Sequence, residues 1–355
     1  MKLNHIKGIY YIGQYGTSGY ASAARGYLYH YHTTGVPITW EPLYFDNSVM
    51  EDDEYNKIVK KIINKPIIYD TVILHCTPDL WSIFRKDRPE LFKNKLVIGY
   101  CAWESEVVSD EWVESINKSV NELWVPSEYN KKVFFNNGVK TIIRVVPHVF
   151  LKYKLPKKSE VSIGDKNLYT FYTIGEFNER KNLKGVIESF CKEFNSHDEV
   201  RLLIKTFYKN HEKINRIKCK RYLNEIITEF SGGDKKNITM LLQPLTNFQI
   251  NELHSIGDCY VGLSRSEGFG LPIYEAYNYG KRIITTAYGG QIDYLKSNYK
   301  GLVDYEMVDV NYMVGNYAGH MENKNNKWAE PNLQSARKLM RQAYTEWKMG
   351  IKNNS

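Results

Sequence analysis

Two glutamates, Glu267 and Glu275, are separated by seven residues that include two glycines and a proline. The run before them, residues 259–263, is short, apolar and β-prone, and the proline suits the first position of a helix, so the unit is predicted to be strand, loop and helix. Gly268 and Gly270 let the backbone approach a ligand closely, and the N–H groups at a helix start attract anions. One carboxylate before the turn and one in the first helical turn could hold hydroxyl groups on both sides of a bound phosphate. A sugar nucleotide offers that pattern.

Two simpler interpretations of these glutamates remain open. In one, Glu267 caps the following helix and Glu275 is an ordinary solvated helical residue. In the other, the two carboxylates are the acid–base pair of a glycosidase. The glycine–proline frame and its anion site favour ligand binding over the first interpretation. Glycosidase carboxylates usually come from separate elements that flank the sugar, which argues against the second.

Apolar, β-prone runs alternate with amphipathic stretches, which predicts parallel β–α–β units and an α/β fold. Strands are expected at residues 6–12, 36–40, 71–75, 96–101, 122–125 and 142–146, and again at 169–174, 201–206, 238–242, 259–263, 282–286 and 301–303. Helices are expected at 21–31, 53–65, 110–118, 128–135 with Ser127 as its N-cap, 183–194, 247–255 and 333–349. The predicted organisation is a first domain, a polar lysine-rich linker, a second domain and a C-terminal helix, at residues 1–150, 151–166, 167–330 and 331–355.

Several stretches resemble the family 4 retaining glycosyltransferases. EGFGLPIYE resembles the Glu-x7-Glu signature of that family, and GEFNERKN (residues 175–182) resembles its phosphate-binding loop. GYCAWESEVVSDEW and NELWVPSEYNKKVF resemble the late part of its first domain, and KWAEPNLQSARKLMRQ its C-terminal helix region. The resemblance implies the GT-B fold, with two Rossmann-like parallel-sheet domains that face a cleft. The terminal helix of this fold often crosses back to the first domain; packing on its own domain is the alternative.

The resemblance also implies roles for residues of the second domain. Glu275 is expected to bind the ribose hydroxyls, Glu267 the ring hydroxyls of the donor sugar, and Lys181 the phosphates, with Arg180 beside it. Retaining transfer loosens the sugar–phosphate bond, so these groups would act by positioning and by stabilising negative charge. Sugar or phosphate is expected to meet the backbone of Gly268, Phe269, Gly270 and Leu271.

One residue departs from the family pattern. Many members have an arginine directly after the glycine of the phosphate loop, where this chain has Glu176. A carboxylate there would repel a diphosphate. Glu176 is therefore expected to point away from the phosphates, or Arg180 to replace the missing charge.

In the family that the chain resembles, the glycine loop after the first strand borders the cleft, between the acceptor and the donor phosphates. By resemblance, Gly16, Gly19 and Tyr20 lie at the cleft. The alternative is that the glycines serve only a tight strand-to-helix turn.

Three further residues of the first domain follow predicted strands. His75 ends a strand, where parallel sheets bind ligands, although a lone histidine is more often a structural group. The usual cleft histidine of the family is absent after the next strand. In that loop, Trp103 could stack on a sugar and Glu104 could accept the proton of the acceptor hydroxyl.

Composition restricts the function classes. A chain of 355 residues with 43% hydrophobic and 25% charged residues is globular, and its net charge of +8 favours an anionic partner, either the nucleotide diphosphate or a membrane surface contacted peripherally. No nucleic-acid module accompanies the lysines. No metal-ligand pattern is seen, so no metal and no cofactor other than the donor are expected. Five scattered cysteines and the lack of a membrane-spanning run predict a cytoplasmic protein.

The leading hypothesis is a metal-independent retaining glycosyltransferase that moves a sugar from a UDP- or GDP-sugar to a glycan, lipid-linked or small acceptor. Two alternatives remain. A sugar-nucleotide epimerase of the same architecture would turn over the donor without an acceptor. An inactive glycan- or nucleotide-binding subunit would bind ligand without turnover.

Overall fold

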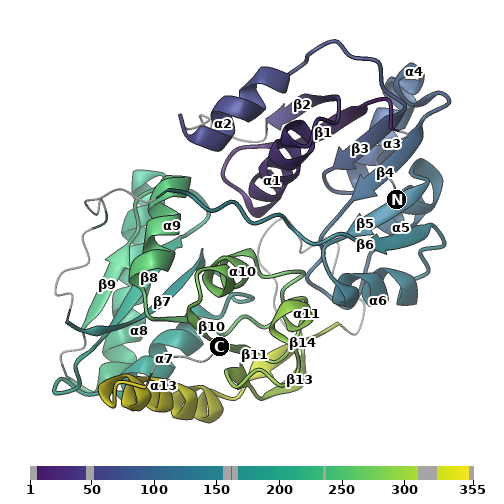
Figure 1. Cartoon of the computed structure of the whole chain (residues 1–355). Coiled ribbons are helices and arrows are strands. Elements are labelled where there is room, and N and C mark those ends of the chain that lie inside the picture. The colour runs from purple at the N-terminus through teal and green to yellow at the C-terminus, as the bar shows by residue number, and fades with distance from the viewer. Residues whose placement is uncertain are drawn as a thin grey trace. The chain divides into compact units, whose positions relative to one another are not determined.

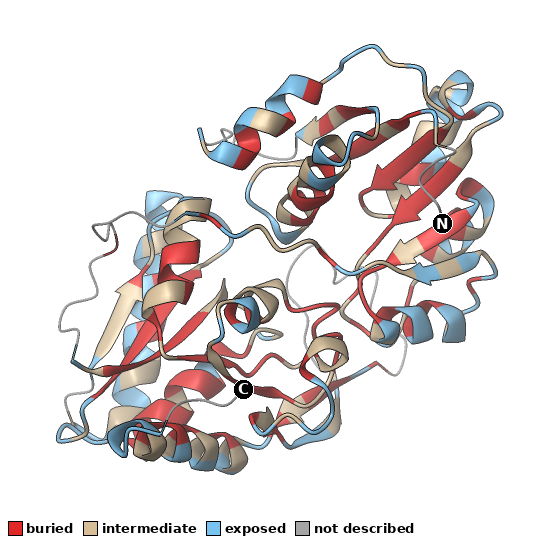
Figure 2. Cartoon of the chain, viewed as in Figure 1, coloured by how far each residue is buried: buried red, intermediate tan, exposed pale blue. Residues whose placement is uncertain are grey.

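The computed structural model describes residues 6–44, 52–154, 161, 167–234, 237–310 and 326–351. The chain divides into two compact units, Met1–Leu151 and Lys152–Ser355 (Figure 1). Most of the predicted linker, residues 155–160 and 162–166, lies outside the described residues. Buried residues concentrate on the sheet strands and on the inner faces of the helices in each unit (Figure 2).

The first unit contains one six-stranded parallel sheet in the order β2-β1-β3-β4-β5-β6. Its strands are β1 (Ile9–Tyr15), β2 (Ile38–Tyr44), β3 (Thr71–His75), β4 (Leu96–Tyr100), β5 (Glu122–Val125) and β6 (Ile142–Val145). Its helices are α1 (Gly19–Thr33), α2 (Glu54–Val59), the 3₁₀ helix η2 (Lys60–Ile62), α3 (Asp79–Asp87), α4 (Pro89–Phe92), α5 (Asp110–Ser119) and α6 (Glu128–Asn136).

Side-chain caps define where several of these helices begin. Ser18, Asp53 and Ser109 each accept a hydrogen bond from a backbone N–H of the first turn of α1, α2 or α5. Ser127 does the same for α6, which confirms the N-cap predicted for that helix. Helices α3 and α4 were not predicted.

The second unit repeats this architecture with the strand order β12-β11-β10-β7-β8-β9. Its strands are β7 (Tyr169–Glu176), β8 (Val200–Phe207), β9 (Ile238–Leu241), β10 (Cys259–Gly262), β11 (Arg282–Thr286) and β12 (Leu302–Val303), and an antiparallel pair is added by β13 (Tyr305–Asp309) and β14 (Lys327–Pro331). Its helices are α7 (Leu183–Glu193), α8 (Lys213–Ser231), α9 (Asn247–Ile256), α10 (Leu271–Asn278), α11 (Ile292–Leu295) and α13 (Leu333–Lys348).

Successive residues of β8 point to two different hydrophobic clusters. Leu202 and Ile204 belong to the cluster with α7, α8 and α13, whereas Leu203 belongs to the cluster with α9, α10 and α11. This alternation places helices on both faces of the sheet, as the apolar strands of a parallel sheet require.

The C-terminal helix α13 packs on α7 of its own unit. Met340 and Tyr344 join the hydrophobic cluster of that face. Arg337 and Arg341 donate to the carboxylate of Glu193 at 3.2 and 2.9 Å. The structure therefore supports packing of the helix on its own domain, the alternative to a helix that crosses back.

All five cysteines are buried free thiols. Within the described part of the chain, none of the helices has the length and apolar character needed to cross a bilayer.

Candidate active site

The two glutamates lie on the predicted strand–loop–helix unit. Strand β10 ends at Gly262, and α10 begins at Leu271 after Gly270, whose φ of 78° is in the left-handed region that favours glycine. Pro272 was predicted to be the first helical residue, but it is the second. Glu275 consequently lies in the second turn of α10, which corrects the prediction of a first-turn carboxylate.

Neighbouring segments fix the backbone of this loop. The carbonyl of Glu267 accepts a hydrogen bond from the N–H of Gly290 at 2.8 Å. Gly289 has a φ of 105°, and a Cβ there would lie 2.7 Å from the Glu267 carbonyl, so only glycine fits. The Tyr294 hydroxyl lies 3.0 Å from the Phe269 carbonyl and 3.1 Å from that of Gly270. Sequence patterns do not indicate these contacts, because they come from the loop and helix that follow another strand, β11.

The carboxylate of Glu267 is held between two cations. The Lys181 amine donates to its Oε1 at 2.6 Å, and Arg180 Nη1 approaches Oε2 at 3.3 Å. Arg180 also donates to the carbonyl of Ser266 at 2.7 Å. Burial alone would raise the pKa of Glu267, but the charges of Lys181 and Arg180 and the hydrogen bonds to this carboxylate outweigh it and lower the pKa to about 2. Glu267 is therefore an ionised, buried carboxylate.

The two cations come from the loop between β7 and α7. Asn182 adopts a left-handed φ of 48° and caps α7 by accepting from the N–H of Gly185 at 3.1 Å. The Asn178 side chain accepts from the N–H of Lys181 at 2.9 Å, which fixes the turn before the cap. Strands β7 and β10 are neighbours in the sheet, so their following loops meet at the carboxyl edge, where parallel sheets bind ligands.

Arg265 joins the two loops, and sequence reasoning had missed it. Its N–H donates to the Arg180 carbonyl at 2.8 Å, and its guanidinium donates to the carbonyl of Glu179. The same guanidinium binds both carboxylate oxygens of Glu330 on β14 and lies over the ring of Trp328. Arg265 thus holds the phosphate-loop candidate against the paired-glutamate loop.

A pocket lies between these loops. Its lining includes side chains and backbone of β7, the following loop, β10 and the start of α10: Thr173, Ile174, Gly175, Glu176, Lys181, Leu183, Tyr260, Gly262, Ser264, Glu267, Pro272 and Ile273. The structure therefore brings Lys181 and Glu267 to one hollow.

Glu176 also lines this pocket. The expectation was that its side chain would point away from the phosphates. Its carboxylate accepts from the Asn178 amide at 3.1 Å. Burial raises the pKa of Glu176 above its usual range, although the Asn178 hydrogen bond and the charges of Arg180 and Lys181 act in the opposite direction. Whether Arg180 replaces the missing charge toward the phosphates stays a prediction.

Glu275 has different surroundings. Its Oε2 lies 3.2 Å from Nε2 of the buried His254, and its side chain is 21% exposed. Glu275 is not among the residues that line the pocket described above. Tyr260 lies near both glutamates: burial raises the pKa of its hydroxyl, and the charges of Glu267 and Glu275 raise it further.

The candidate acceptor residues follow β1 and β4 or, for His75, end β3, and these three strands are adjacent in the first sheet. Gly16 has a φ of 125°, so the turn itself requires glycine, whereas an added Cβ at Gly19 would meet no atom within 4 Å. The Tyr20 hydroxyl accepts from the N–H of Ala102 at 3.0 Å and lies 2.8 Å from its carbonyl. Tyr20 thereby connects the glycine loop to the loop that contains Trp103 and Glu104.

His75 and Trp103 are core groups in the structure. His75 is 1% exposed, bonds to the Tyr11 hydroxyl, and has its pKa lowered by burial and by the neighbouring His148. Trp103 is fully buried, packs on Trp112 with ring centroids 4.6 Å apart, and donates from Nε1 to the carbonyl of Val107 at 2.7 Å. Because its faces are covered by protein, the expectation that Trp103 stacks on a sugar is wrong. Glu104 is partly buried in the same loop.

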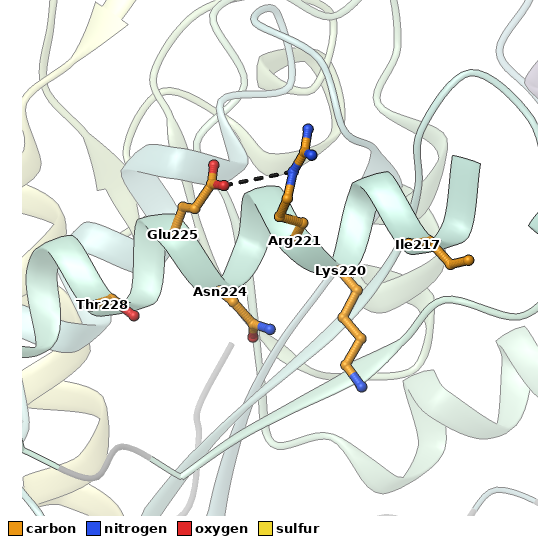
Figure 3. Close-up of a pocket in the computed structure, with 6 residues that line it drawn as sticks. All are labelled: Ile217, Lys220, Arg221, Asn224, Glu225 and Thr228. Carbon is orange, nitrogen blue, oxygen red and sulfur yellow. Dashed lines mark ion pairs between the residues drawn. The ribbon is translucent and has the colours of Figure 1, made fainter. Parts of the chain in front are cut away.

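A second, more open hollow runs along α8 (Figure 3). All six labelled residues project from this one helix, with Arg221 and Glu225 paired at 3.6 Å. Its lining comes from a single exposed helix face, so it lacks the convergence of several strand ends that marks the pocket beside Glu267. Across the described residues, no cluster of histidine, cysteine, aspartate and glutamate is arranged to hold a metal ion.

Part of the chain matches a known protein family. Residues 156–306 match the family described as "Glycosyl transferases group 1". This match contains the two loops that hold Lys181, Arg180, Glu267 and Glu275. No curated protein matches the sequence significantly.

Solved structures match over most of the chain. Alr3699/HepE from Anabaena, in complex with UDP and glucose, is similar with a TM-score of 0.60 and 13% identity, over 83% of this chain and 85% of that one. A sucrose-phosphate synthase from Thermosynechococcus elongatus has a TM-score of 0.59 and 13% identity, over 97% and 94% of the two chains. At such identities the likeness concerns the fold, and it confirms the predicted pair of parallel α/β sheets of the GT-B type.

Proposed function

We propose that the chain is a glycosyltransferase of group 1, the family that its residues 156–306 match, and that it moves a sugar, with retention and without a metal ion, from a UDP- or GDP-sugar to a glycan, lipid-linked or small acceptor. The observation that carries the proposal is the buried group of Glu267, Lys181 and Arg180 at the carboxyl edge of the second sheet. The Anabaena structure with the same fold was solved with UDP and glucose, which supports a nucleotide-sugar donor.

The cations of this group can bind a diphosphate while they hold Glu267. An ammonium group has three N–H donors, of which Glu267 engages one of Lys181, whereas Arg180 donates both to Glu267 and to the carbonyl of Ser266. Glu267 and the two cations together have a formal charge of +1, which the second carboxylate of the pocket, Glu176, offsets while it is ionised. Negative charge that develops on the leaving diphosphate would be stabilised by groups already oriented in a largely buried site.

Glu267 would act as a fixed acceptor for hydroxyl groups of the donor sugar. Its pKa of about 2 keeps it ionised, and an ionised carboxylate accepts hydrogen bonds at both oxygens. A negative group near the anomeric carbon also favours an oxocarbenium-like transition state over the neutral ground state. Glu275 would hold the ribose hydroxyls on the other side of the phosphates.

A binding screen tests the donor class first. We expect UDP or GDP to raise the melting temperature of the protein, and the matching nucleotide sugar to raise it further. If none of UDP, GDP, ADP and their sugars shifts the melting temperature or binds by calorimetry, the proposal is wrong.

Replacement of Glu275 by alanine tests the ribose contact. We expect the affinity for the nucleoside diphosphate to fall about tenfold or more, because hydrogen bonds to a charged acceptor are lost. Glu188→Ala is a matched control, since Glu188 is also 21% exposed and paired with Lys192 on the exposed surface of α7. Equal affinity for both variants and the wild type would remove Glu275 from the site.

Turnover assays separate the remaining alternatives. The proposed reaction releases a nucleoside diphosphate only with an acceptor or, slowly, with water, and continues in EDTA. Conversion of one sugar nucleotide into another without an acceptor would indicate the epimerase. Complete loss of turnover in EDTA, restored by a divalent ion, would contradict the metal-independent mechanism.

A further inference from the structure

Behind Glu275 lies a buried chain of two hydrogen bonds. His254 of α9 has no exposed surface, and its Nε2 lies 3.2 Å from Oε2 of Glu275. On the other side of the ring, Nδ1 lies 3.1 Å from the hydroxyl of Tyr172 in the middle of β7. Tyr172 is also fully buried. Side chains of β7 and α9 thus form a chain that ends on the carboxylate of α10.

The chemistry of the three groups sets the direction of both hydrogen bonds. An ionised carboxylate can only accept, so Nε2 of His254 carries the proton that is donated to Glu275. In the neutral imidazole, Nδ1 is then the acceptor, and the Tyr172 hydroxyl is its donor. Burial raises the pKa of Tyr172 well above its usual range, so this hydroxyl keeps its proton. The chain therefore runs from Tyr172 through His254 to Glu275.

The imidazole ring is also fixed by packing. It stacks on Tyr279 with an interplanar angle of 14°, and it meets Tyr172 edge-on at 73°. Tyr279 is itself held, because its hydroxyl donates to Asn251 at 2.8 Å. A ring packed in this way cannot rotate without breaking both hydrogen bonds, so it can impose an orientation on Glu275.

We propose that His254, oriented by Tyr172, is a positioning residue for the donor's ribose, acting through Glu275; this rests on the proposed function of Glu275 in ribose binding. The hydrogen bond fixes Oε2. Among the described residues Oε1 has no bonding partner, so it is the oxygen that accepts from a ribose hydroxyl. Holding a flexible side chain in its binding rotamer before the ligand arrives reduces the entropy lost on binding.

The test compares each ribonucleotide with an analogue that lacks the ribose hydroxyls. Affinities of UDP and GDP, and of their 2′,3′-dideoxy forms, are measured by calorimetry for the wild type and four variants. His254→Phe keeps an aromatic ring but removes both hydrogen bonds, and His254→Gln keeps a donor close to the position of Nε2. Tyr172→Phe removes only the outer hydrogen bond. Leu253→Ala is the control for packing, because Leu253 is a buried neighbour on α9 that points into the apolar cluster.

The expected result is a loss of discrimination. The wild type should bind the ribo form about tenfold or more tightly than the dideoxy form, since charged hydrogen bonds are made only to the former. His254→Phe should lose most of this ratio by weakening only the ribonucleotide, His254→Gln should retain a large part of it, and Tyr172→Phe should give an intermediate value. Leu253→Ala should lower the melting temperature and leave the ratio unchanged.

Other outcomes distinguish a failure of the role inferred for His254 from a failure of the proposed function. If His254→Phe and His254→Gln keep the wild-type ratio while their melting temperatures fall, the histidine is only structural and the inference is wrong, although the donor site stands. If the wild type itself does not discriminate, Glu275 does not bind the ribose and the inference also fails. If no nucleotide binds to the wild type, the proposed function fails with it. Should His254→Phe not fold, His254→Gln and Tyr172→Phe still give the ratio.

Discussion

The carboxyl edges of the two sheets carry polar groups of opposite character. In the first unit, His75 bonds to Tyr11, and Tyr100 lies 3.2 Å from the ring nitrogen of His148. These are neutral groups that satisfy one another. In the second unit the corresponding edge has Glu267 between Lys181 and Arg180, with Glu176 beside them.

This difference separates polar groups that stabilise a fold from polar groups prepared for a ligand. In a neutral hydrogen-bonded pair, the two side chains satisfy each other's hydrogen-bonding groups, so they need no ligand. Burying an ion group has a large desolvation cost, and the ammonium group of Lys181 retains donors that Glu267 does not use. The second edge is therefore the better place to look for chemistry, even though both units have the same architecture.

Glu267→Gln should produce the largest change. We expect turnover to fall by a factor of about 10² to 10³, the range for loss of one preorganised electrostatic group. Free nucleoside diphosphate should bind as well as before or more tightly, because Lys181 and Arg180 lose their competing anion. Steady-state kinetics and calorimetry on the same preparation check both effects.

Glu193→Gln provides the matched control for this experiment. Glu193 is also a largely buried carboxylate between two cations, Arg337 and Arg341, but it joins α7 to α13. Its replacement should lower stability and leave turnover unchanged. If both variants lose stability alike and neither loses turnover, the ion group of Glu267 is structural, and the contrast between the two edges disappears.

Acid should destabilise the first unit before the second. Burial lowers the pKa of His148 from 6.5 to about 3, so below pH 6.5 the unfolded chain takes up a proton that the folded unit excludes. Stability from this group falls as the pH drops from 6.5 toward 3, by about 2 kcal/mol at pH 5. The pKa of Glu267 is lowered to about 2, so its contribution is complete above pH 4.5 and is lost only as the pH falls toward 2.

Limited proteolysis with peptide identification at pH 7 and pH 5 measures this order. Cleavage of the first unit should accelerate more at pH 5 than cleavage of the second, where the partly buried His211 also has a lowered pKa. His148→Gln removes one titrating group and should flatten the pH dependence of the first unit. Cleavage that accelerates equally in both units would contradict the assignment of the acid sensitivity to His148.

Glu176→Gln should have a smaller effect, on affinity. Burial raises the pKa of Glu176, so lowering the pH toward that value removes its negative charge and should strengthen binding of UDP or GDP. The glutamine variant should bind more tightly at neutral pH, by about tenfold or less, and should lose this pH dependence. Glu188→Gln, on the exposed side of α7, should behave like the wild type. An unchanged affinity and pH profile for Glu176→Gln would place this carboxyl away from the phosphates.

The sequence predicted the strands of both sheets and the unit around Glu267 because apolar runs, glycines and prolines act locally. The resemblance of two loops to the family pattern also predicted that Lys181, Arg180 and Glu267 lie in one donor site. The sequence could not predict His254, Tyr172 or Arg265, because each acquires its role from a contact with a residue far along the chain. A histidine in an apolar helix looks the same in sequence whether it contacts a glutamate or a leucine.

The prediction that Trp103 stacks on a sugar was wrong for a related reason. An aromatic residue in a loop after a strand suits both sugar stacking and core packing, and only burial distinguishes the two. Trp103→Phe should therefore give the smallest functional change. The loss of the Nε1 hydrogen bond to Val107 and of ring volume should lower stability by about 1 to 3 kcal/mol. The KM for the acceptor should stay within about twofold of the wild-type value, a difference below 0.5 kcal/mol. A KM that rises tenfold at unchanged melting temperature would mean that the ring meets the acceptor, and that the first edge is less self-contained than its hydrogen bonds indicate.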